Sequence, residues 1–88
     1  MPDCAALLAL ATRNPRGLRF EQLCALAECF GFVHRKSKRG TSHRLYKREG
    51  IMQLLNFQPD RNGMAKPYQV MQLLVAIERL VVEGKADS

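Results

Sequence analysis

FVHRKSKRGTSHRLYKREGIMQLLNF, residues 32–57, is the stretch of sequence that decides the fold. It contains three short β-favouring runs, 32–36, 42–47 and 53–57, which are separated by turns that contain glycine. Runs of this length joined by such turns predict a small antiparallel meander of three strands. The pattern on both sides of the stretch is helical, so we expect helices before and after the sheet.

The first predicted hairpin carries the residues of most chemical interest. If residues 38–40 form a three-residue loop with Gly40 in the left-handed conformation, His43 lies opposite Arg35. A slip of one residue would place His43 opposite His34 instead, because side chains alternate between the two faces of a strand.

Residues 3–12 and 19–30 predict two amphipathic helices. The first has apolar residues at i, i+3, i+4 and i+7, with Asp3 as the N-cap, and the turn at 14–17 ends it. The second also has one apolar face, and Gly31 stands where a helix would stop.

A last helix is predicted to begin at Lys66-Pro67-Tyr68, after the turn-rich stretch 58–63. Its apolar residues form one continuous stripe at helical spacing, which makes it the best-defined core element. The stripe consists of Val70, Leu73, Leu74, Ile77, Leu80 and Val81.

The predicted order α-α-β-β-β-α defines an α+β domain in which helices cover one face of the sheet and leave the other open. Eighty-eight residues are enough for one domain. We expect residues 1–13 to form an extra N-terminal helix, 14–82 the core and 83–88 a frayed tail.

The formal net charge of +6 favours association with polyanions, among which RNA and DNA come first. An apolar run long enough to span a membrane and a secretory leader are both missing from the sequence, so we expect no membrane association and a cytoplasmic location. Cys4, Cys24 and Cys29 are odd in number and are expected to be reduced, with neither a disulfide framework nor a zinc site.

His43 is the candidate catalytic residue. RNA can be cleaved without metal or cofactor if a base takes the proton of the ribose 2′-hydroxyl while cations stabilise the phosphate. Neighbouring arginines disfavour a further positive charge, so we expect a neutral His43 that is suited to act as the base. The other interpretation is a basic, solvated hairpin with an incidental histidine, and His34 in the preceding strand is interpreted as structural.

The cations around His43 are candidates for RNA binding, because half of the chain's 14 lysines and arginines lie between residues 35 and 48. About half of them are expected to touch substrate, since a strand has two faces. Ser42 and Lys66, the latter at the start of the last helix, complete the set. The candidates are Arg35, Lys36, Lys38, Arg39, Ser42, Arg44, Lys47, Arg48 and Lys66.

Four segments in this order resemble the HicA toxins of bacterial toxin-antitoxin systems. They are Arg19-Phe20-Glu21-Gln22-Leu23-Cys24, Phe30-Gly31-Phe32, Gly40-Thr41-Ser42-His43-Arg44-Leu45-Tyr46, and Asn56-Phe57-Gln58-Pro59 leading into Lys66-Pro67-Tyr68-Gln69-Val70. The family's commonest pattern has glycine two residues before its catalytic histidine, whereas here Thr41 stands at that position.

The resemblance implies a double-stranded-RNA-binding-domain-like fold and an mRNA interferase, that is, an endoribonuclease that cleaves mRNA without metal. It also implies that His43 is the general base and that a HicB-type antitoxin protein covers the site. We expect the free toxin to be a bacterial cytoplasmic monomer. Two alternatives share the same basic face: a non-catalytic RNA-binding module, and a subunit that docks on an acidic partner protein.

Overall fold

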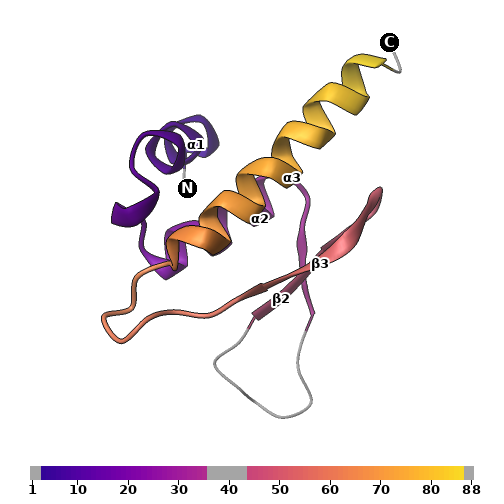
Figure 1. Cartoon of the computed structure of the whole chain (residues 1–88). Coiled ribbons are helices and arrows are strands. Elements are labelled where there is room, and N and C mark those ends of the chain that lie inside the picture. The colour runs from indigo at the N-terminus through magenta and orange to yellow at the C-terminus, as the bar shows by residue number, and fades with distance from the viewer. Residues whose placement is uncertain (1–2, 36–43, 87–88) are drawn as a thin grey trace.

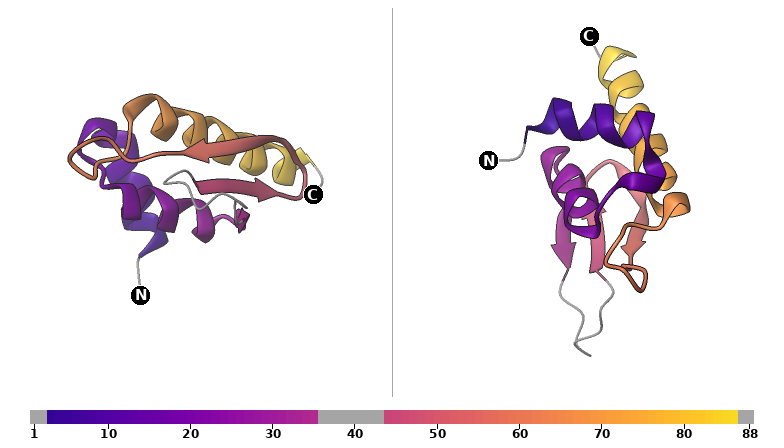
Figure 2. Two further views of the ribbon diagram at one scale, coloured as in Figure 1. Left: turned by 90° about the horizontal axis from the view of Figure 1, so that it is seen from below. Right: turned by 90° about the vertical axis from the view of Figure 1, so that its left-hand side faces the viewer.

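The computed structural model describes residues 3–35 and 44–86 and has the predicted α+β architecture. The helices are α1 (Cys4–Arg13), α2 (Phe20–Cys29) and α3 (Pro67–Ala86), with a short 3-10 helix, η1 (Pro15–Gly17), between the first two. The strands β1 (Val33–Arg35), β2 (Arg44–Arg48) and β3 (Ile51–Phe57) form one antiparallel sheet in the order β1-β2-β3. Figures 1 and 2 show the three helices and the sheet.

The ends of α1 and α2 follow the predicted signals. The carboxylate of Asp3 accepts hydrogen bonds from the backbone N–H groups of Ala5 and Ala6, at 3.1 and 3.3 Å, and so caps α1. Gly31, just after α2, has a φ of +86°, which a residue with a Cβ rarely adopts. Local sequence signals therefore mark the start of α1 and the end of α2.

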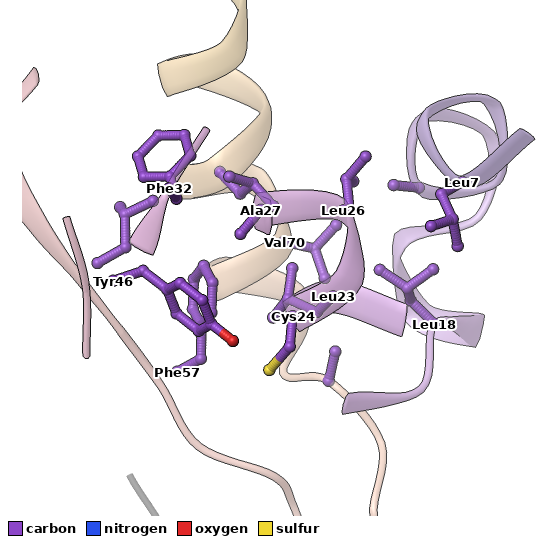
Figure 3. Packing of buried hydrophobic residues seen from close by; sticks show 14 of the residues in the cluster. Leu7, Leu18, Leu23, Cys24, Leu26, Ala27, Phe32, Tyr46, Phe57 and Val70 are labelled. Atoms are coloured by element: carbon purple, nitrogen blue, oxygen red, sulfur yellow. The ribbon is translucent and has the colours of Figure 1, made fainter. Parts of the chain in front are cut away.

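One hydrophobic core lies between the helices and one face of the sheet (Figure 3). The strands contribute Tyr46, Leu55 and Phe57, all at most 1% exposed. Leu7 and Ala11 of α1 belong to the same cluster, so the extra N-terminal helix packs on the domain. On the last helix, Val70, Leu73 and Ile77 are buried as predicted, but Val81 is 48% exposed and lies outside the core. The helix itself continues to Ala86, although we expected a frayed tail from residue 83.

The register of the first hairpin differs from both predicted alternatives. Arg35 lies opposite Leu45, and His34 lies opposite Tyr46, so neither is paired with His43. The prediction assumed that a three-residue loop sets the register. In the structure β2 begins only at Arg44, and the register places Tyr46 opposite the core residue Leu55 of β3.

The cysteine prediction was wrong for two of the three residues, because Cys4 and Cys29 form a disulfide that joins α1 to the end of α2. Their Cα atoms lie 5.8 Å apart, within the usual range for such a bond. Cys24 is free and buried, as expected for a reduced core cysteine. The error arose because proximity of Cys4 to Cys29 depends on how α1 packs on α2, which residue spacing along the chain does not reveal.

The disulfide is expected to stabilise the fold by closing a loop of 25 residues. In the chain-entropy model, a loop of this length restricts the unfolded chain enough to add about 3 kcal/mol to the free energy of unfolding. Urea denaturation with and without a thiol reductant measures this effect. Cys4→Ala should unfold at the reduced protein's midpoint and be insensitive to reductant; equal midpoints for the oxidised and reduced wild type would contradict the prediction.

Candidate nucleic-acid interface

The predicted site is divided by the boundary of the described residues. Arg35 ends β1 and Arg44 begins β2, so these two arginines flank segment 36–43. Five of the predicted site residues lie outside the described residues: Lys36, Lys38, Arg39, Ser42 and His43. The remaining candidates, Arg35, Arg44, Lys47, Arg48 and Lys66, can be placed.

Strand alternation separates the four cations of β1 and β2 into two pairs. Tyr46 points into the core, so its neighbours at i±2, Arg44 and Arg48, lie on the face that the helices cover. Lys47 lies on the opposite, open face, together with its partner Val33 and with Arg35, two residues further along β1. Val33, Arg35, Lys47 and Glu49 line one shallow hollow there.

Arg48 acts as a structural residue. Its Nε donates a hydrogen bond of 2.7 Å to the carbonyl oxygen of Phe30, and its Nη1 donates another of 2.7 Å to that of Glu49. The first bond connects β2 to the end of α2, where a Cβ on Gly31 would lie only 3.0 Å from the Arg48 Nε. The guanidinium therefore fixes the helix end to the sheet, with two of its five N–H donors committed to backbone carbonyl groups.

Arg44 is exposed to solvent, but its guanidinium also contacts side chains on the face of the sheet that the helices cover. Its guanidinium carbon lies 5.4 Å from the centre of the Phe20 ring, a cation–π distance. A hydrogen bond that its guanidinium donates to the Tyr46 hydroxyl oxygen is the largest of the influences that raise the pKa of Arg44, so its charge is fixed. This leaves a permanent, oriented cation at the first residue of β2, next to His43 in the sequence.

The groups beneath Arg44 stay uncharged. Burial raises the pKa of the Cys24 thiol, and burial is also the first cause of the raised pKa of the Tyr46 hydroxyl. The two groups point toward one another in Figure 3, and the Tyr46 hydroxyl donates to Oε2 of Glu28 at 3.3 Å. A neutral thiol and a neutral phenol are poor nucleophiles, so neither Cys24 nor Tyr46 is a candidate for covalent catalysis. The two side chains instead form the uncharged surroundings of the Arg44 guanidinium.

Lys66 lies at the same end of the sheet as Arg44, because Arg44 pairs with Phe57 and Gln58 follows directly. The Lys66 Nζ lies 3.5 Å from Oε1 of Gln58, a long and replaceable contact. Gln58 is itself held through its backbone N–H, which donates to the buried Gln69 side chain at 2.9 Å. The lysine is thus half-buried before the first turn of α3, where an anion can take the place of the amide oxygen.

Sequence reasoning missed the apolar content of the open sheet face. Val33 is 62% exposed and Leu54 53%, and Met52 is fully exposed. The alternation of β3 could have shown this, since Leu55 and Phe57 must point inward once Tyr46 does. The open face therefore combines two cations, Arg35 and Lys47, with large apolar side chains. Tyr68, at the start of α3, is also exposed.

Two other features of the described residues bear on the kind of site. They contain no group of three or more His, Cys, Asp and Glu side chains placed to hold a metal ion. In the same ranges, no helix has the length and apolar character needed to cross a membrane. Comparison of the chain with protein-family models, with curated proteins and with solved structures gives no match.

The different roles of Arg48 and Lys47 can be tested with a matched pair of variants. Arg48→Ala removes charged hydrogen bonds to backbone and should lower the free energy of unfolding by about 2 kcal/mol. Lys47→Ala should change it by less than about 0.5 kcal/mol, but should weaken binding to single-stranded RNA and reduce the log-log salt slope by about 1. Denaturation and RNA titrations check both, and a reversed pattern would contradict the placement.

Proposed function

We propose that the chain is an endoribonuclease toxin with a double-stranded-RNA-binding-domain-like fold, similar to the HicA toxins in mechanism and substrate. The observation that carries the proposal is the pair of arginines, Arg35 and Arg44, that end β1 and begin β2 on either side of segment 36–43. The segment itself contributes His43 and three further cations by sequence. By sequence, the segment and the two arginines beside it supply a base and a concentration of positive charge.

In the proposed reaction, neutral His43 removes the proton from a ribose 2′-hydroxyl of mRNA. The 2′-oxygen then attacks the adjacent phosphorus to give a 2′,3′-cyclic phosphate, and the bond from phosphorus to the 5′-oxygen of the next nucleotide breaks, with that oxygen taking a proton from solvent to leave as a hydroxyl. Arg44 stabilises the charge on the phosphate oxygens, because its guanidinium is oriented by Phe20 and Tyr46 and carries a charge that does not titrate. The flanking phosphates are positioned by Lys66 and, on the open face, by Arg35 and Lys47.

The proposed partner is a HicB-type antitoxin protein that covers the open sheet face. Exposed Val33, Met52 and Leu54 support this role, because large apolar side chains beside cations are typical of protein contacts and add little to the binding of phosphates. Such a partner would be expected to carry acidic side chains opposite Arg35 and Lys47. Covering this face would remove Arg35 and Lys47 from contact with RNA.

Replacing His43 tests the catalytic proposal. In His43→Ala we expect RNA cleavage to fall by at least about a hundredfold, since general base catalysis contributes a factor of this size, while RNA binding is retained. The measurement is cleavage of single-stranded RNA by wild type and variant with a chelator present, paired with RNA titrations over a range of salt. Contacts to about four phosphates predict a log-log salt slope near −3.

Lys47→Ala is the matched control, because it should weaken RNA binding without removing the base. An His43→Ala variant that cleaves as fast as wild type would reject the assignment of the base. A wild type that binds RNA but never cleaves it would favour the non-catalytic RNA-binding module instead. A salt slope near zero would favour the subunit that docks on an acidic protein.

A further inference from the structure

Helix α3 is apolar on two opposite sides. Its inner side carries the buried residues Val70, Leu73 and Ile77. Its outer side carries large apolar side chains that are all about half exposed: Tyr68 at 59%, Met71 at 50%, Val75 at 49% and Val82 at 58%. The outer side of a surface helix is ordinarily polar, so burial in the core does not explain these residues.

The outer residues follow the spacing of a helix-pairing seam. Tyr68, Met71, Val75, Glu78 and Val82 are separated by steps of three, four, three and four, the a/d pattern of a heptad repeat. At about 100° per residue they form a stripe opposite the inner one, some 21 Å long. A seam of this kind fits a second helix lying along it, rather than a small molecule or a flat surface.

The surface along this seam is hollowed and accessible. Val75, Glu78, Arg79 and Val82 line one open hollow, and a second adjoins it along Tyr68, Met71, Gln72, Val75 and Gln53 of β3. The C-terminal turns of α3 project beyond the other helices in two orthogonal views (Figures 1 and 2). Another helix can therefore lie along α3 without meeting α1 or α2.

We infer that the outer seam of α3 is a self-association surface, on which α3 of a second copy of this chain lies antiparallel. A two-fold axis passing between Glu78 and Arg79 places Glu78 of each copy opposite Arg79 of the other, and Val75 opposite Val82. All four residues that line the first hollow are then paired, the charges with charges and the valines with valines. Between Val75 and Val82 the seam is complementary to itself, which a helix of one charge sign would not be, while Tyr68 and Met71 lie beyond this paired segment.

Two chains of net charge +6 repel each other overall, but the pair of opposite charges lowers this repulsion where the two copies meet. At the seam Glu78 and Arg79 balance, so the contact region is neutral although the chain as a whole is basic. This inference does not rest on the proposed function, because the seam faces away from the core while the open sheet face lies on the far side of the sheet. It does revise the expectation that the free protein is a monomer.

Sedimentation equilibrium of the full chain tests the inference. We expect two chains per particle, with a dissociation constant of about 100 μM or tighter. Val75→Asp places an uncompensated carboxylate at the seam and should weaken association at least about tenfold. A wild type that sediments as a single chain at about 1 mM would overturn the inference.

A charge exchange tests the geometry independently of any loss of apolar surface. Glu78→Arg and Arg79→Glu should each weaken association about tenfold, because each places like charges opposite one another. The double variant, Glu78→Arg with Arg79→Glu, should associate as wild type does. Glu21→Arg on α2 changes the net charge by the same amount as Glu78→Arg and should leave association unchanged. A double variant no better than the single ones would overturn the antiparallel pairing, and circular dichroism verifies that every variant is folded.

Discussion

The burial of Tyr46 in the central strand is the constraint on which the rest of the structure depends. Its ring lies 5.5 Å from the ring of Phe57 on β3 and 5.5 Å from that of His34 on β1, so it joins all three strands. Its hydroxyl reaches Glu28 of α2. Because a strand alternates, fixing this one side chain inward sends Lys47 to the open face and turns Arg44 and Arg48 toward the helices.

This constraint explains why a strongly basic hairpin does not act as one uniform patch. Arg48 fixes α2 to the sheet, Arg44 is oriented over Phe20, and Lys47 lies in a hollow with Val33, Arg35 and Glu49. Charges that look equivalent in the sequence thus differ in role. Arg48 contributes to stability, Arg44 is held in a fixed orientation at the end of the sheet, and Lys47 faces solvent. Mutating them together would mix a folding defect with a binding defect, which is why single variants are informative here.

Most of the architecture was predictable because its signals are local. Asp3 and Gly31 mark helix ends through their own side-chain or backbone chemistry, and the inner stripe of α3 follows a period that few other structures produce. The hairpin register and the Cys4–Cys29 disulfide were not predictable, because they depend on packing between elements distant in sequence. For the candidate site, composition showed that cations gather near His43, while only the position of Tyr46 decides which face each cation occupies.

The two exposed apolar surfaces of the domain lie on opposite sides of its core, and this separation has a consequence for assembly. The open sheet face carries Val33 and Leu54 beside Arg35 and Lys47, whereas the outer seam of α3 carries a balanced charge pair. A positively charged apolar face favours a partner of opposite charge, whereas a charge-balanced seam permits contact with another copy of the chain. Pairing through α3 would therefore leave the open sheet faces of both copies free, so that one assembly would present two faces that each carry Arg35 and Lys47 beside apolar side chains. Linking two sites raises the affinity for any ligand long enough to reach both, because the second contact forms within the complex already made.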